Sequence, residues 1–182
     1  RHKNVISAVG EIKSVDFFLN NNPIDLKVTF FPNQYMEEKL REKLGKKELT
    51  WLKHKAKEVS IIVDRTQTDS QQLYTLSEKL AEIGRNDILE ELKNKKKEVI
   101  AYAQSHIEEL MTWLYENQGE MRFGAENRLF LILVDPTNMN ESWKMKRAFA
   151  LIEPKVKDYL DHFNEDSLKE ISFSFKGNMY KS

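Results

Sequence analysis

The stretch Ser14–Phe31, SVDFFLNNNPIDLKVTFF, predicts a β-hairpin whose two strands are joined by a turn rich in asparagine. Its predicted strands, Ser14–Asn20 and Ile24–Phe31, consist mainly of β-branched or large apolar residues, which strands favour. Burying a charge without a partner is costly, so charged residues within such strands need an explanation. The stretch contains three of them: Asp16, Asp25 and Lys27.

The length of the turn decides whether these three side chains share a face. If Asn21-Asn22 form a two-residue turn, or Asn20–Pro23 a four-residue turn, Asp16 lies opposite Lys27 and Asp25 lies one diagonal step from Asp16. Side chains alternate between the faces of a strand, so all three then emerge on one face within about 5–8 Å. A three-residue turn would place Asp16 on the other face. We therefore expect an even-numbered turn.

Two carboxylates and an ammonium group on one face suit the hydrolysis of a phosphodiester. Carboxylate oxygens are the protein ligands that Mg²⁺ prefers, together with water and phosphate oxygens. A bound metal ion lowers the pKa of water and stabilises the charge that develops on a phosphoryl group. The lysine would orient or deprotonate the attacking water. The alternative is a structural hairpin with a cross-strand ion pair between Asp16 and Lys27, which would contribute little to stability.

Asp16, followed after eight residues by Asp25-Leu26-Lys27, resembles the D…(D/E)-x-K signature of the PD-(D/E)xK nucleases, which include many type II restriction endonucleases. Val15 replaces the proline of that signature, and Asp25 replaces the commoner glutamate. The resemblance implies that Asp16, Asp25 and the backbone carbonyl of Leu26 hold Mg²⁺, or Mn²⁺ in its place, and that Lys27 acts on water. It also adds Glu11 as a candidate acidic residue, with solvent exposure as the alternative.

The remaining chain predicts helices and strands that fit an α/β (α+β) fold. We expect helices over Tyr35–Leu44 and Glu48–Lys57, almost continuous helix from Ser70 to Gln118, and a helix from Glu141 to Phe163 that Asn140 caps and Pro154 kinks or splits. Asp69 is a candidate cap for the helix after it. Short apolar runs predict strands at Val59–Val63, Arg128–Asp135 and Ile171–Phe175, and the spacing of Val5, Ile6 and Val9 is helical.

The core of the resembled family is a helix, three antiparallel strands, a crossover helix and a fourth strand. On that pattern the hairpin supplies the first two strands, Arg128–Val134 the third, Glu141–Phe163 the crossover helix and Glu170–Phe175 the fourth. Val59–Val63 is either an added strand or the third core strand. We thus expect one domain over residues 1–182, with a mixed central sheet of about four to five strands, flanking helices and a mostly helical insertion at about residues 35–127.

Composition limits the classes of function. Lysine and arginine (29) balance aspartate and glutamate (29), so any contact with DNA must come from local patches. Candidates are Lys144, Lys146 and Arg147, with a solvated surface as the alternative. The chain has no cysteine, no apolar run long enough to span a membrane and no visible signal peptide, so we expect a cytoplasmic protein without disulfides. Because it begins at Arg1, we expect a fragment or a processed product.

From these observations we expect a Mg²⁺-dependent DNA endonuclease. The resemblance also implies a homodimer, because each active site in that family cuts one DNA strand. A repair or recombination nuclease of the same fold is an alternative. The chain could also work within a larger protein or system. A different class of function stays open, in which the hairpin is structural and the helices of Ser70–Gln118 bind a protein.

Overall fold

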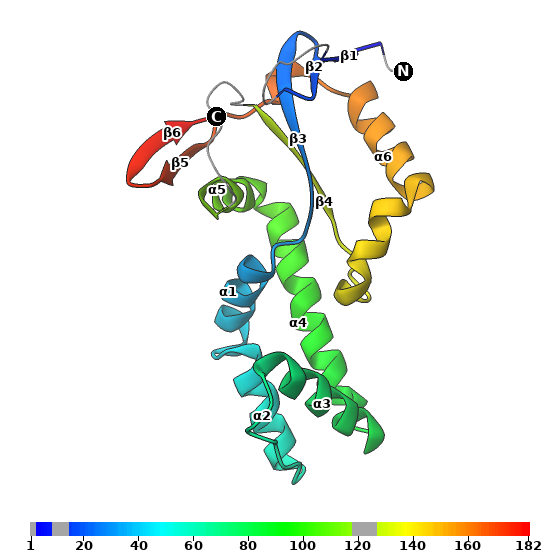
Figure 1. Ribbon diagram of the computed structural model, residues 1–182, viewed down its shortest axis with the longest axis vertical. Helices are drawn as coiled ribbons and strands as arrows, with labels where there is room; N and C mark the ends of the chain where they lie inside the picture. The colour runs from blue at the N-terminus through cyan, green and yellow to red at the C-terminus, as the bar shows by residue number, and fades with distance from the viewer. Residues whose placement is uncertain (1–2, 9–14, 118–126) are drawn as a thin grey trace. The chain divides into compact units, whose positions relative to one another are not determined.

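The computed structural model describes residues 3–8, 15–117 and 127–182 (Figure 1). It is a mixed α/β structure that divides into two compact units. One unit combines Arg1–Phe31 with His106–Ser182, and the other is Pro32–Ser105. The first unit contains the sheets and the second is helical. Within the described residues, no helix is long and apolar enough to cross a membrane.

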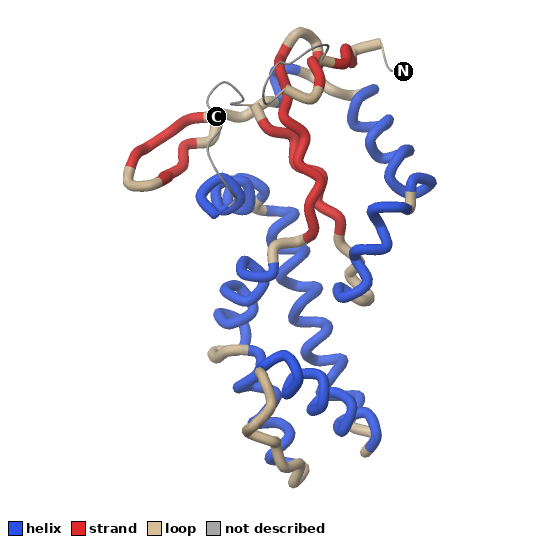
Figure 2. The backbone as a smooth tube through the Cα atoms, viewed as in Figure 1, coloured by secondary structure: helices blue, strands red, loops and turns tan. Residues whose placement is uncertain are grey.

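The first unit is built on a four-stranded sheet. The strands are β1 (Val5–Ser7), β2 (Phe17–Leu19), β3 (Asn22–Phe30) and β4 (Arg128–Leu133), and their order in the sheet follows their order in the chain. The first three strands are antiparallel, whereas β4 runs parallel to β3 along six residue pairs. Figure 2 shows β3 and β4 as two long neighbouring strands. The predicted strand at Arg128 is confirmed, but it is not antiparallel to its neighbour as expected.

The hairpin between β2 and β3 has the expected even-numbered turn in a different register. Its turn residues are Asn20 and Asn21, with φ of 47° and 72°, and Leu19 pairs with Asn22. Positive φ at both central residues is typical of a type I′ turn, which suits the twist of a hairpin and tolerates asparagine. The shift of two positions preserves the alternation of side chains. Continued by one residue beyond β2, this register would place Asp16 level with Asp25 instead of Lys27.

Helix α5, the helical segments that follow β4 and a second hairpin, formed by β5 (Ser172–Phe175) and β6 (Asn178–Lys181), complete the described part of this unit. Helix α5 (Ile107–Asn117) packs against β4 and against the second hairpin. The Tyr115 ring of α5 contacts Phe130 of β4 edge-on at 5.6 Å and stacks on Phe173 of the second hairpin at 4.6 Å. The 3₁₀ helix η1 (Met139–Arg147) and helix α6 (Phe149–Asp161) follow β4, and a short 3₁₀ turn, η2 (Glu165–Ser167), follows α6. Figure 1 shows α5 and α6 on opposite sides of the β3–β4 pair.

The helix predicted at Glu141–Phe163 is not continuous. The chain breaks at Ala148, whose ψ of 58° is not helical, and Pro154 lies inside α6. Asn140 does not cap the segment, which begins after Asn138. Trp143 and Phe149 in this segment are exposed.

Three further strand assignments are corrected. Val5–Ser7 is a strand, not part of a helix. Among the strands of the described residues, β5 (Ser172–Phe175) pairs only with β6 (Asn178–Lys181), so it is not the fourth strand of the central sheet. Val59–Val63 is not a strand: the Ile61 N–H donates to the Ala56 carbonyl at 2.9 Å, and Ser60 has φ of 60°. This arrangement is a Schellman motif, so the segment ends a helix and leaves Ile62 exposed.

The second unit consists of four helices around an apolar core. Helices α1 (Asn33–Leu44) and α2 (Glu48–Glu58) match the predicted segments, and α1 ends at Gly45 with φ of 69°, as the glycine predicts. Helix α3 (Asp69–Glu82) is capped by Thr68 and Gln71 in a capping box, not by Asp69. Helix α4 (Asn86–Ser105) follows Gly84. The core is formed by Leu40, Leu52, Ala56, Leu76, Leu80, Ile88 and Val99.

Candidate metal centre

Asp16 lies beside the third strand at the point where the β2–β3 ladder ends. Its exposed side chain accepts a hydrogen bond at 2.7 Å from the Leu26 backbone N–H to Oδ2. The Asp16 N–H in turn donates to the Ile24 carbonyl at 2.8 Å. These two bonds hold the Asp16 carboxylate against the Asp25–Leu26 segment, so the first predicted acidic residue lies next to the second.

Asp25 and Lys27 lie on the same face of β3 and form an ion pair. Lys27 Nζ donates to Asp25 Oδ1 at 2.8 Å. The Asp25 side chain is only 4% exposed, whereas that of Lys27 is 35% exposed. The structural alternative had an ion pair between Asp16 and Lys27 across the hairpin, whereas the observed pair lies within one strand. The aspartate side chain is buried, and the lysine side chain is about one-third exposed.

Arg128 is a further residue of the site that sequence reasoning did not identify. It is the partner of Asp25 in the parallel β3–β4 register, and its Nε lies 3.5 Å from Asp25 Oδ2. Its side chain is 7% exposed. The only sequence signal is a charged residue at the head of the most apolar run in the chain, RLFLILV. Asp25 is thus a buried carboxylate between two cations.

The backbone carbonyl of Leu26 points toward the same side as the Asp16 carboxylate. In a strand, the N–H and C=O of one residue face the same neighbouring strand, and the Leu26 N–H is bonded to Asp16. The site therefore offers Asp16, the Leu26 carbonyl and Asp25 as oxygen ligands. Asp25 Oδ2 is buried without a hydrogen bond in the described part of the chain. Oxygen donors together with several waters are the ligands that Mg²⁺ prefers, and in this structure both Asp25 oxygens face cations, Lys27 Nζ at 2.8 Å and Arg128 Nε at 3.5 Å.

A third carboxylate is not supplied by the described residues. No group of three or more His, Cys, Asp or Glu side chains that could hold a metal ion occurs among residues 3–8, 15–117 and 127–182. Glu11, the additional acidic candidate, lies outside the described residues. The described site accordingly rests on two carboxylates and one carbonyl.

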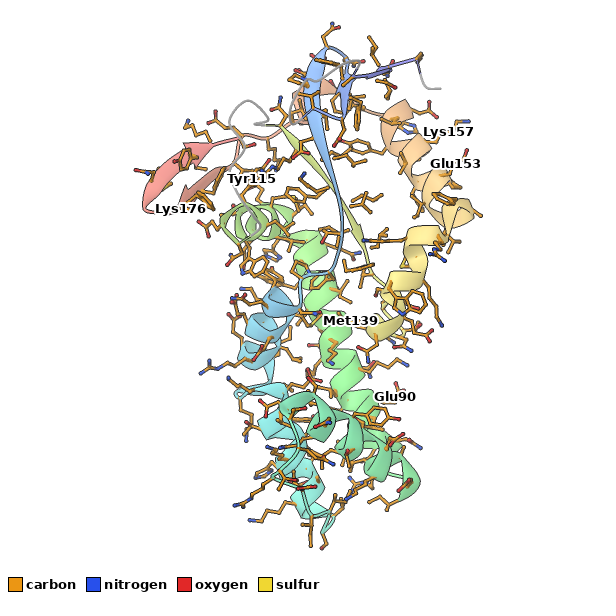
Figure 3. The ribbon with its side chains drawn as sticks, viewed as in Figure 1. Glu90, Tyr115, Met139, Glu153, Lys157 and Lys176 are labelled. Carbon is orange, nitrogen blue, oxygen red and sulfur yellow. The ribbon has the colours of Figure 1, made fainter. Side chains whose placement is uncertain are left out.

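A cavity of about 130 Å³ lies beside this site at the start of β4. Arg128 lines it together with apolar and aromatic side chains of α5 and of the α6 end, including Tyr115, Tyr159 and Phe163. Figure 3 labels Tyr115 on α5. Asp16, Asp25 and Lys27 do not line this cavity, so Arg128 is the residue that joins the two features.

The candidate DNA contacts lie away from the carboxylates. Lys144, Lys146 and Arg147 are exposed in the last turn of η1. Lys144 Nζ pairs with Glu141 at 2.6 Å, and Lys146 Nζ lies 4.7 Å from the centroid of the Phe30 ring. Because Phe30 is three residues after Lys27, its side chain points to the opposite face of β3, about 10 Å along the strand. These residues therefore do not join the site.

Comparison of the chain with protein-family models, curated proteins and solved structures finds no match.

Proposed function

We propose that this protein is a Mg²⁺-dependent DNA endonuclease that resembles the PD-(D/E)xK nucleases. The observation that carries the proposal is the hydrogen bond from the Leu26 N–H to the Asp16 carboxylate, at the residue between the ion-paired Asp25 and Lys27. This bond brings the Asp16 carboxylate to the strand segment that carries the other two residues of the signature. A buried aspartate beside a more exposed lysine is the kind of arrangement that a hydrolytic site requires.

Each residue has a distinct role in the proposed site. Asp16, Asp25 and the Leu26 carbonyl would hold Mg²⁺, which when bound activates water and stabilises charge on the phosphate. The Asp16 carboxylate is oriented by the Leu26 N–H, and Asp25 is fixed by its ion pairs. Lys27 would hold or deprotonate the attacking water and neutralise a phosphate oxygen. Its partial exposure leaves the ammonium accessible to substrate.

The topology of the central sheet supports the same proposal. Three antiparallel strands occur first, and after the helices a fourth strand adds in parallel to the third. In an assignment that differs from the one expected from the sequence, β1, β2 and β3 would be the three antiparallel strands of the resembled core and β4 its fourth strand. Asp16 precedes the second strand, and Asp25 and Lys27 belong to the third.

The test is cleavage of plasmid DNA by the purified protein with and without Mg²⁺. We expect nicked or linear products only with the metal. Lys27→Ala should lower the rate by at least about a hundredfold, the usual effect of losing a positioned acid–base group. Lys157→Ala is the matched control, because Lys157 is an exposed lysine of α6 in the same unit (Figure 3). Equal cleavage by Lys27→Ala and the parent protein would refute the assignment.

The form of DNA that is cut separates the nuclease classes. Linear, supercoiled and branched DNA are offered in parallel across a Mg²⁺ titration. Cutting at fixed positions in linear duplex would favour a restriction enzyme, whereas a preference for branched DNA would favour a role in repair or recombination. If no form is cut and Mg²⁺ leaves the melting temperature unchanged, a non-catalytic interaction module replaces the nuclease proposal.

A further inference from the structure

Arg128 and Asp25 face each other with two unsatisfied atoms. Arg128 Nε and Asp25 Oδ2 are 3.5 Å apart, and neither atom has a hydrogen-bond partner among the described residues, although both are buried. A buried polar atom without a hydrogen bond is costly, and such atoms are rare in native proteins. The Arg128–Asp25 contact therefore calls for a reason beyond stability.

The Arg128 side chain packs on the ring of Tyr115. The carbon of its guanidinium group lies 5.4 Å from the centroid of the Tyr115 ring. Tyr115 stacks on Phe173 at 4.6 Å, and its hydroxyl accepts a hydrogen bond from Ser182 Oγ at 2.7 Å. Helix α5 and the end of the chain thus support the arginine. A guanidinium packed on an aromatic ring in a buried position has little freedom to move.

Lys27, the other cation on Asp25, differs from Arg128 in exposure. Its Nζ donates to Asp25 Oδ1 at 2.8 Å, and its side chain is far more exposed than that of Arg128. Asp25 therefore has a buried cation near one oxygen and a more exposed cation on the other. Any cation that takes Oδ1 must displace the Lys27 ammonium, because like charges repel and the position is occupied.

We propose that Arg128 is a positioning residue that keeps Lys27 away from the second oxygen of Asp25. When Oδ1 is taken by a metal ion, Lys27 cannot move to Oδ2, because Arg128 faces that oxygen. Lys27 must then turn from Asp25 toward solvent and substrate. This inference rests on the proposed function, since it assigns the step that makes Lys27 available for water and phosphate.

The first test follows the Lys27 ammonium by nuclear magnetic resonance in the full chain without DNA. An ammonium group held by a carboxylate gives an observable nitrogen–proton signal at low temperature, and a group released to water does not. The signal is assigned with Lys27→Arg. In the parent protein, Mg²⁺ should remove it. In Arg128→Met the signal should persist even at a Mg²⁺ concentration at least about tenfold above the one that halves the signal of the parent protein. A factor of about ten is what one retained charge-assisted hydrogen bond is expected to contribute.

Two variants control for charge and for folding. Lys169→Met makes the same exchange of a cation for methionine at an exposed residue of the same unit, paired with Glu108, and should behave as the parent. Arg128→Lys keeps a cation beside Oδ2 and should restore release of Lys27. If circular dichroism shows that Arg128→Met does not fold, Arg128→Gln replaces it in the comparison with Arg128→Lys.

The kinetic readout separates positioning from general structure. Arg128→Met should lower the maximal cleavage rate about a hundredfold, while the Mg²⁺ concentration for half-maximal rate changes by less than about threefold. Loss of the Lys27 signal at the same Mg²⁺ concentration in Arg128→Met and the parent would overturn the inference. So would a Lys27 signal that Mg²⁺ leaves unchanged in a parent protein that cuts DNA. Failure of the parent to cut any DNA overturns the proposed function instead.

Discussion

The Asp25 carboxylate has two roles that must be separated in any mutational study. It is one of the three proposed metal ligands, and it is also the counter-ion of a buried arginine. A substitution at this position changes the electrostatics of the fold as well as the chemistry. Asp16 differs, because its carboxylate is exposed and bonds only to a backbone N–H among the described residues.

Asp25→Asn should destabilise the protein, because it leaves Arg128 as a buried cation without a counter-ion. Removing one partner of a buried ion pair costs about 3–5 kcal/mol. Urea unfolding followed by circular dichroism measures the free energy of unfolding. A loss below about 1 kcal/mol would show that Arg128 reaches water in solution, contrary to the burial of its side chain.

Asp16→Asn is the matched variant, and it should leave stability nearly unchanged. The asparagine carbonyl oxygen can still accept the hydrogen bond from the Leu26 N–H, and an exposed charge contributes little. The variant should nevertheless lose the stabilisation by Mg²⁺ that the proposed site confers on the parent protein. Thermal melts with and without Mg²⁺ measure both effects. An undiminished Mg²⁺ response would remove Asp16 from the list of ligands.

Some residues of the site could be predicted from the sequence, and others could not. Asp25 and Lys27 are two residues apart, so the two-residue period of a strand is enough to place them on one face of β3. The pairing of Asp25 with Arg128 joins residues from distant parts of the chain. That register depends on how β4 docks beside β3, which local periodicity does not determine. The shared face of Asp25 and Lys27 could be predicted for this reason, whereas the buried cation beside Asp25 could not.

At the scale of elements, the turn of the β2–β3 hairpin controls the geometry of the site. Asn20 and Asn21 both have positive φ, a conformation that costs other residues with side chains about 1–2 kcal/mol. Asn21→Ala should therefore lower the free energy of unfolding by about 1 kcal/mol. Asn21→Gly should be neutral or slightly stabilising, because Asn-Gly is the preferred type I′ pair. Equal stabilities of the two variants in urea would contradict this turn.

The success of element prediction depended on whether the signal was local. Gly45 and Gly84 end their helices in left-handed conformations, so the ends of α1 and α3 could be predicted from two residues. Val59–Val63 has the composition of a strand, but its backbone hydrogen bonds complete the end of α2. Apolar composition alone does not distinguish a buried strand from an exposed helix terminus.

The start of α4 should contribute stability that depends on pH. Arg85 Nε and Nη2 bind the two carboxylate oxygens of Asp87 at 2.8 Å each, which lowers the pKa of Asp87 to about 2. A pKa lowered by folding stabilises the protein above the unfolded value of about 4, and this contribution is lost as the pH falls toward 2. Asp87→Asn should therefore lower the melting temperature slightly at pH 7, and the difference should vanish near pH 2. Arg85→Gln should show the same trend.

At the scale of the molecule, the two units differ in whether they are formed by one continuous segment of the chain. The sheet unit combines Arg1–Phe31 with His106–Ser182, so its β3–β4 pairing requires contacts between distant segments. The helical unit is one continuous segment, Pro32–Ser105. Local contacts favour fast folding, whereas pairing of distant strands is slower. The helical unit is thus suited to fold without the remaining chain.

We expect the isolated segment Pro32–Ser105 to fold by itself into a cooperative helical structure. Its core side chains Leu40, Leu52 and Leu80 are completely buried, and ion pairs such as Lys96–Glu48 at 2.7 Å join its helices. A length of about 70 residues is enough for a stable domain. Circular dichroism of the segment should show helix and a single thermal transition.

Leu80→Ala tests whether that transition reports the core of the unit. Deleting a fully buried leucine side chain costs about 2–5 kcal/mol, so the variant segment should melt at a much lower temperature or remain unfolded. Tyr74→Ala, an exposed change on the same helix, should have a small effect. A segment that melts gradually, or responds equally to both substitutions, would mean that the helices of Pro32–Ser105 depend on the rest of the chain for their packing.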